Sequence, residues 1–217
     1  RSKKNIYKVK LVKTKLNIDY EKISEYKNLF INKKKGNVII FKKSDIDFFD
    51  ESKHIISINK FDAKYEYKKD LDELTLKGIF LGDDININFE SYLNKEKNLL
   101  VKLKALNFLS KISFENNKKE NIIVGKALIK KDKNKITSIF NFKNNEIIIK
   151  QANLRNSFSD GKIFGKIKFK PFFDFDLNID LKSLNFYILS KYINALDDNS
   201  KKNLFLINRK INGEINL

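Results

Sequence analysis

The sequence predicts an all-β fold, mainly an antiparallel meander, in which a long curved sheet has one apolar face forming a groove and a short helix lies near the C-terminus. Apolar and polar residues alternate with a two-residue period along most of the 217 residues, which places every second side chain on the same face of a strand. Turn sequences separate these stretches at short intervals, and short connections join antiparallel neighbours. Only one segment has clear helical spacing.

In the first half of the chain, residues 61–67 and 74–80 alternate apolar with polar or charged side chains. The sequence GDD at 82–84 then leads into residues 85–89, where isoleucine and phenylalanine alternate with asparagine. Glycine and aspartate favour turns, so residues 74–89 predict a hairpin. Residues 99–105 continue the same pattern.

In the second half, residues 124–130 and 136–142 are separated by the turn sequence KDKNK. Asn144 and Asn145 then turn the chain into EIIIKQANL. Asparagine tolerates the left-handed backbone conformation that tight hairpin turns require. These residues therefore predict three further antiparallel strands.

The clearest alternation runs over residues 161–181. Isoleucine, glycine and phenylalanine face one way and lysine the other until Pro171, which interrupts the ladder; after it, apolar residues alternate with aspartate and asparagine. A lysine row that faces an aspartate row across a hairpin is a favourable pairing on a solvated surface. The pattern therefore predicts both the hairpin and its register.

Residues 183–198, SLNFYILSKYINALDD, break the two-residue period and place apolar residues near helical spacing. Ser183 is the expected N-cap of this helix. A weaker helical candidate covers residues 20–30. The sequence returns to strand patterns after the C-terminal helix.

We expect residues 1–217 to form a single β-rich unit, because one proline and seven glycines leave no linker-like stretch. The first residue is Arg1 rather than methionine, which is expected of a fragment of a longer chain. No cysteine is present, so disulfides and thiolate chemistry are excluded for these residues. The lack of cysteine fits either a reducing cytoplasm or a periplasm.

The formal net charge is +18, and lysine and arginine can bind polyanions by releasing counterions. The basic residues are almost all lysine, however, with Arg1, Arg155 and Arg209 the only arginines. Base-edge and bidentate phosphate contacts favour arginine. We therefore attribute the charge mainly to a composition rich in lysine, asparagine and isoleucine, and expect no specific nucleic-acid partner. Anionic lipid headgroups or a polyanion are the alternatives.

Residues that carry chemistry are scarce. His54 is the only histidine, so neither a catalytic triad nor a histidine-based metal site can form within this chain; we expect it to be an exposed residue at a strand end. Adjacent or alternating aspartates fit turns and solvated strand faces better than catalysis or calcium binding. We expect a non-enzymatic protein with no cofactor and no metal.

The aromatic residues suggest a different kind of site. Nineteen phenylalanines and eight tyrosines occur mostly on the one-sided rows, and a sheet with one apolar face must cover it with another sheet, a helix or a ligand. Gly78, Gly125 and Gly165 interrupt these rows and would let a long sheet curl. The candidate lipid-contact residues are Phe140, Phe142, Ile163, Ile167, Phe169, Phe173, Phe175, Leu177 and Ile179.

Residues 136–186 read ITSIFNFKNNEIIIKQANLRNSFSDGKIFGKIKFKPFFDFDLNIDLKSLNF. The order of elements is a strand, a hairpin, a GxxxGxIxF strand and an alternating strand that leads into a helix. This order resembles the C-terminal β-rich region of AsmA-like proteins. In this chain, that region would cover residues 136–217. The resemblance implies an envelope protein of Gram-negative bacteria, anchored in the inner membrane and extending through the periplasm. Members of that family are β-rich, have a long hydrophobic groove, and are linked to phospholipid movement and outer-membrane integrity.

The sequence thus leads to one main hypothesis, a periplasmic protein that holds or conducts lipid acyl chains between the two membranes. Its expected partners are phospholipid acyl chains, a membrane contacted through an anchor outside these residues, and other envelope proteins. The alternative is a closed β-sandwich that scaffolds other envelope proteins and carries no lipid.

Overall fold

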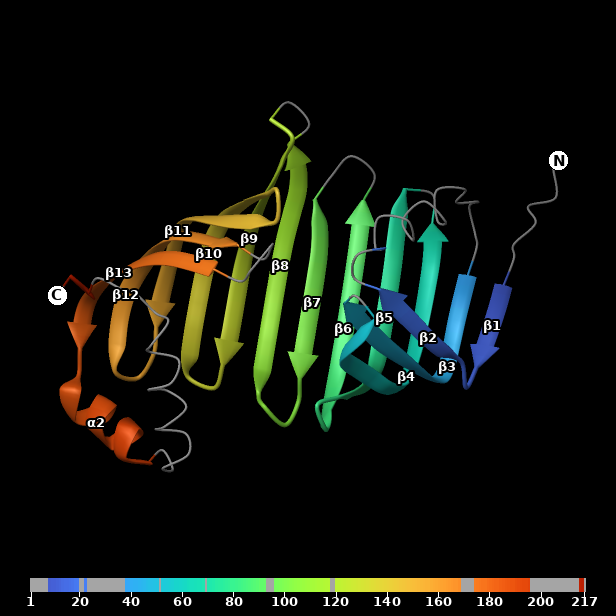
Figure 1. Cartoon of the computed structure of the whole chain (residues 1–217), viewed down its shortest axis with the longest axis horizontal. Helices are drawn as coiled ribbons and strands as arrows, with labels where there is room; N and C mark the ends of the chain where they lie inside the picture. The colour runs from blue at the N-terminus through green and yellow to red at the C-terminus, as the bar shows by residue number, and fades with distance from the viewer. Residues whose placement is uncertain are drawn as a thin grey trace. The chain divides into compact units, whose positions relative to one another are not determined.

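The computed structural model describes residues 8–19, 22, 38–50, 52–68, 70–92, 96–117, 120–168, 174–195 and 215–216 (Figure 1). The chain divides into two compact units, residues 1–113 and 114–217, and each is considered by itself. The expectation that residues 1–217 form a single β-rich unit stays a prediction.

The first unit contains strands β1 (Lys8–Val12), β2 (Lys15–Asp19), β3 (Val38–Asp50), β4 (Lys53–Lys68), β5 (Leu71–Phe80), β6 (Asp83–Tyr92) and β7 (Lys97–Leu103). Strand β8 (Phe108–Asn117) crosses the boundary. The second unit contains β9 (Ile122–Lys131), β10 (Asn134–Lys143), β11 (Glu146–Arg155), β12 (Ser159–Lys168), β13 (Asp174–Leu184), helix α2 (Phe186–Ala195) and β14 (Ile215–Asn216).

The predicted all-β fold is confirmed. From β3 to β14 the hydrogen-bonded order of the strands is also their order along the chain, as expected of a meander. Most pairs are antiparallel; the exceptions in the described residues are β1 and β2, which both pair in parallel with β3, and β14, which pairs in parallel with β13. The sequence did not predict these parallel pairs.

The predicted hairpins are present, but the turn predicted at residues 82–84 lies one residue earlier, since Asp83 and Asp84 already belong to β6. Leu81 and Gly82 both have positive φ angles, of 52° and 80°, and connect β5 to β6. Asn144 and Asn145, with φ angles of 51° and 60°, connect β10 to β11 in the same way. Two successive residues of positive φ match the right-handed twist of the flanking strands, so these turns set the antiparallel register that follows.

Strand β3 bends at Ser44; β1 pairs with the part of β3 before this bend and β2 with the part after it. The side chain of Ser44 is fully buried at this bend; its Oγ accepts a hydrogen bond from Thr14 N (3.1 Å) and donates one to Lys42 O (3.2 Å). Register shifts on both sides of Ser44 show that the ladder with β4 is interrupted here. Such irregularities bend a strand and increase its twist.

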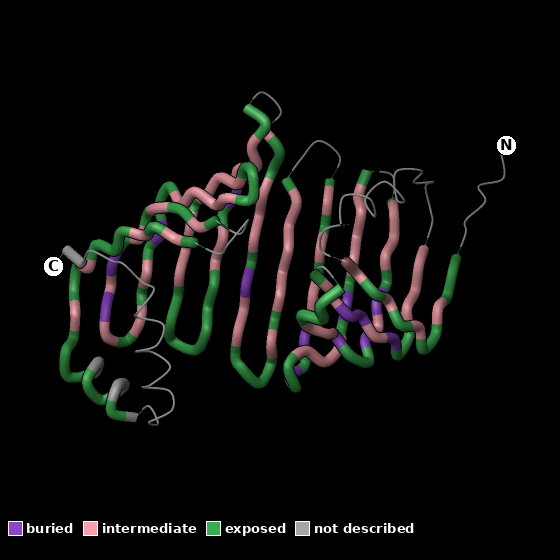
Figure 2. The backbone as a smooth tube through the Cα atoms, viewed as in Figure 1, coloured by how far each residue is buried: buried purple, intermediate pink, exposed green. Residues whose placement is uncertain are grey.

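The bend lets unit 1 cover part of its own apolar face. Ile46 of β3 and Ile58 and Phe61 of β4 form a buried cluster with Leu76 of β5 and Ile85 of β6, and side chains of β2 and β7 pack against it. Figure 1 shows β2 and parts of β3 and β4 passing across β5 and β6, and Figure 2 shows buried positions gathered in this region. Unit 1 thus has a small two-layer core.

The centre of this core gives a first prediction. Phe61 is only 1% exposed, so Phe61→Ala should leave a cavity and lower the free energy of unfolding by about 3 kcal/mol or more. Phe164→Ala is the matched control, because Phe164 is 46% exposed and its truncation should change stability far less. Urea unfolding followed by circular dichroism measures both, and equal effects would contradict a core centred on Phe61.

Asp83, the first residue of β6, ties this strand to the connection after β7. It is 7% exposed, and its two carboxylate oxygens accept hydrogen bonds from Ala105 N (2.8 Å) and Leu106 N (3.0 Å). The hydrogen bond from Ala105 N, and after it the one from Leu106 N, lowers the pKa of the Asp83 carboxyl below its usual range. Both hydrogen bonds stabilise the charged form.

A pH dependence follows from the lowered pKa of Asp83. A carboxyl whose pKa is lower in the folded than in the unfolded chain adds stability above the unfolded value, near 3.9, and this is lost as pH falls through the folded value. Asp83→Asn should therefore lower Tm most at neutral pH, and the difference from the wild type should shrink below about pH 4. Asp84→Asn, at the exposed neighbour, is the control; a pH-independent difference for Asp83→Asn would contradict this role.

The predicted C-terminal helix is confirmed as α2, but its predicted cap is wrong. Ser183 still belongs to β13, and the side-chain oxygen of Asn185 accepts the hydrogen bond from Ile188 N (3.1 Å). Asparagine is as good an N-cap as serine, and the strand continues up to Leu184. Residues 196–198 and, except for Lys22, the weaker helical candidate at 20–30 lie outside the described residues. Among the described helical residues, no helix is long and apolar enough to cross a membrane.

Candidate functional site

The strongest candidate site is one face of the sheet in unit 2. Residues directly opposite each other in adjacent strands lie on the same face, so the strand registers define rows of side chains that run from β9 to β13. Two neighbouring rows are Ile123, Phe142, Ile147, Ile167, Phe175 and Gly125, Phe140, Ile149, Gly165, Leu177.

Two further rows lie on the same face. They are Ala127, Ser138, Ala152, Ile163, Ile179 and Ile129, Ile136, Leu154, Gly161, Leu181. Ser138 is the only one of these residues with a polar side-chain atom. We call the surface formed by these four rows the apolar face.

The large side chains of the apolar face are not buried by the described part of the chain. Ala152 is the only buried hydrophobic residue there, at 2% exposed; the large side chains are half-buried or, like Ile129 and Ile179 at 37%, exposed. Figure 2 shows the same contrast, with few buried positions in the strands of unit 2. Unit 1 packs a core on its apolar side, whereas the described residues of unit 2 leave theirs accessible.

The structure brings seven of the nine predicted lipid-contact residues together on the apolar face: Phe140, Phe142, Ile163, Ile167, Phe175, Leu177 and Ile179. Phe169 and Phe173 lie outside the described residues. Contact of these residues with lipid stays a prediction.

Sequence analysis did not identify several members of this face, among them Ile147, Ile149 and Leu154. The run EIII has no alternation, so its pattern does not show which isoleucines share a face. A bulge between Ile149 and Ala152 then shifts the phase of β11. Only the pairing with β10 and β12 resolves this assignment.

Gly125 makes room for an aromatic side chain on the apolar face. It lies opposite Phe140, and a Cβ added to Gly125 would come within 2.5 Å of Phe140 Cζ. The ring of Phe140 therefore lies across the backbone of β9. This is a physical reason for a glycine within a strand.

This contact gives a prediction for the site. Gly125→Val should displace the Phe140 ring and lower the free energy of unfolding by about 1–3 kcal/mol, because the added side chain overpacks the contact. Ala127→Val is the control: Ala127 lies on the same strand and face but already has a Cβ and is opposite Ser138. Urea unfolding of both variants tests this, and an unchanged midpoint for Gly125→Val would show that the ring moves freely.

The opposite face of unit 2 carries the charged side chains of β9 to β13, together with apolar ones such as Ile139, Ile148 and Phe164. Lys162, Lys166 and Lys168 of β12 lie directly opposite Asp180, Asp176 and Asp174 of β13. The predicted pairing of a lysine row with an aspartate row is thus confirmed. Since β-strand side chains alternate, this pairing and the apolar pairing of the other face specify the same register.

The sole histidine belongs to a polar network in unit 1. His54 is exposed near the start of β4, as predicted, and its Nε2 lies 2.8 Å from Ser57 Oγ. Ser57 Oγ donates to Asp47 Oδ1 (2.5 Å), and Lys15 Nζ lies 2.7 Å from Asp47 Oδ2. Lys15, followed by Ser57, holds the pKa of Asp47 below its usual range.

This network differs from a catalytic triad. In a triad, histidine takes the proton of the serine and a carboxylate orients the histidine. Here the serine donates to the carboxylate itself, and a carboxylate of lowered pKa is a weak base. We therefore assign the network a structural role, joining β2, β3 and β4.

Two findings bear on other functions. Among the residues that the structure describes, no group of three or more His, Asp or Glu side chains could hold a metal ion. No protein-family model, no curated protein and no solved structure matches this chain. The resemblance to AsmA-like proteins therefore stays a prediction.

Proposed function

We propose that the apolar face of unit 2 binds the acyl chains of lipids. The observation that carries this proposal is the continuity of four apolar rows across β9 to β13, with the large side chains left accessible by the described residues. Soluble proteins rarely leave large apolar surfaces exposed, and such surfaces commonly mark interaction sites.

An acyl chain suits this surface physically. Each methylene that leaves water for an apolar contact contributes about 0.8 kcal/mol, and hydrocarbon makes no demand for hydrogen bonds. The rows contain almost no polar side-chain atom that would fix a ligand at one position. Weak contacts repeated from strand to strand therefore favour a ligand that can slide.

The wider function follows as part of the same proposal. A surface that lets acyl chains slide suits movement of phospholipids between an inner and an outer membrane, and the lysine–aspartate ladder of the opposite face is suited to contact with water. The resemblance to AsmA-like proteins supports a periplasmic location, with attachment to the inner membrane through a segment outside these residues, and a contribution to outer-membrane integrity. No step of this function requires catalysis.

A second candidate function is a closed scaffold without lipid. Unit 1 favours it, because there the chain covers apolar side chains with its own bent strands around Phe61. In unit 2 the cover would be another sheet or another envelope protein. The two candidates differ in whether lipid occupies the apolar face of the purified protein.

Native mass spectrometry of protein purified without detergent distinguishes them. Phospholipid should co-purify with the wild type and be lost from Phe175→Asp, because a carboxylate in an apolar row cannot be desolvated cheaply. Phe164→Asp is the matched control: Phe164 belongs to the adjacent strand but projects from the opposite face, since it pairs with Asn178. It should retain the lipid.

Circular dichroism checks that both variants fold. A stable wild-type monomer free of lipid would favour the closed scaffold. Equal lipid loss from both variants would show that binding does not depend on the apolar face.

A further inference from the structure

The charged face of unit 2 contains one row that departs from the pairing of opposite charges. Lys130 of β9 lies opposite Lys135 of β10, Lys135 lies opposite Arg155 of β11, and Arg155 lies opposite Asp160 of β12. Three cationic residues thus occupy successive positions across three strands. Like charges directly opposite each other destabilise a sheet, whereas the lysines of β12 face aspartates.

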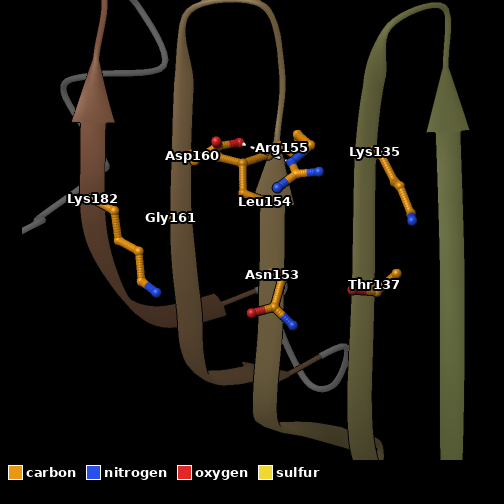
Figure 3. Close-up of a pocket in the computed structure, with 8 residues that line it drawn as sticks. All are labelled: Lys135, Thr137, Asn153, Leu154, Arg155, Asp160, Gly161 and Lys182. Atoms are coloured by element: carbon orange, nitrogen blue, oxygen red, sulfur yellow. Dashed lines mark ion pairs between the residues drawn. The ribbon is translucent and has the colours of Figure 1, made fainter.

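The same row borders a solvent-open cavity of about 280 Å³. Its polar lining comprises Lys135 and Thr137 of β10, Asn153 and Arg155 of β11, Asp160 of β12 and Lys182 of β13. Figure 3 shows Arg155 and Asp160 side by side on neighbouring strands, with Asn153 and Thr137 one step further along their strands and Lys135 and Lys182 on either side. Hydrogen-bond donors, three cations and the carboxylate of Asp160 therefore line one hollow.

The ion pair in this cavity leaves most of the arginine available. Arg155 Nε lies 3.4 Å from Asp160 Oδ1, a distance that holds the side chain by charge more than by a good hydrogen bond. The contact involves Nε, so the two terminal nitrogens of the guanidinium group can still donate to a ligand. Arginine presents these donors in a planar fork that matches phosphate oxygens.

We propose that this cavity is a binding site for a phosphate group. The guanidinium of Arg155 provides the directional contacts, and Lys135 and Lys182 provide charge. The hydroxyl of Thr137 and the amide of Asn153 are additional donors of suitable type. A bound phosphate anion would offset the repulsion between Lys135 and Arg155, which lie opposite each other.

The site does not rest on the proposed lipid function, because its charged side chains project from the face opposite the apolar rows. The phosphate can belong to a soluble phosphate compound or to the headgroup of an anionic phospholipid. The chemistry recognised is the same for both, so the experiment is designed to separate the two sources.

The test compares two double variants of equal charge change. Lys135→Ala with Arg155→Ala removes the site, and Lys166→Ala with Lys168→Ala removes two lysines of the same face whose cross-strand neighbours are aspartates. Tm is measured for each with sodium phosphate and with sodium chloride at matched ionic strength, and affinity for inorganic phosphate is measured by calorimetry. The single variant Lys135→Ala repeats the test if the double variant does not fold.

We expect phosphate to raise the Tm of the wild type and of the control beyond the chloride value, and phosphate affinity to fall about tenfold or more without the site, as expected for the loss of charge-assisted hydrogen bonds. An equal effect of chloride would mean that only screening operates and would overturn the proposal. Equal loss in the control variant would overturn it too, since diffuse charge would then suffice.

Given such binding, co-sedimentation with phosphatidylglycerol vesicles identifies the source. Vesicle binding lost only in the site variant indicates the lipid headgroup. Vesicle binding that is absent or equal in both variants indicates a soluble phosphate compound.

Discussion

The cross-strand register of unit 2 is the constraint on which its two surfaces depend. In a β-strand successive side chains project to opposite faces, so a shift by one residue would exchange the faces. Ile167 lies opposite Phe175 on the apolar face. The neighbouring pair, Lys166 and Asp176, lies on the other face. Apolar contact and charge attraction therefore favour the same register. Each surface reinforces the arrangement of the other.

The two units use similar strands to different effect. In unit 1, the irregular pairing around Ser44 bends β3 and β4, and Phe61 becomes the centre of a buried cluster. In unit 2, irregularities between Ile149 and Ala152 and between Asp160 and Gly161 change the phase of pairing, yet the apolar rows remain accessible in the described residues. Sheet faces are stabilised when covered, which is why the accessible rows suggest a ligand.

The two faces of unit 2 also suit different kinds of ligand. Hydrocarbon needs a continuous surface without preferred positions, and the apolar rows have this property. A phosphate group needs a few fixed donors and positive charge, and the cavity lined by Lys135, Arg155 and Lys182 offers both. The lysines therefore differ in their surroundings. All three lysines of β12 lie opposite aspartates, whereas Lys135 lies opposite two cations.

The strand fold, the hairpin between β5 and β6, the turn at Asn144–Asn145, the C-terminal helix and the pairing of the lysine and aspartate rows could be predicted from the sequence. Each follows from local periodicity or from the backbone preference of turn residues. The alternation also predicted part of the apolar face, namely its large side chains on β12 and β13 and the phenylalanines of β10. Only the tertiary structure decided which isoleucines of the EIII run join that face, that β1 and β2 run parallel to β3, that Asn185 caps α2, and that Lys130, Lys135 and Arg155 lie in one row. These features depend on bulges and on registers between strands, which bring together residues distant in the chain and leave no periodic signal in any single strand.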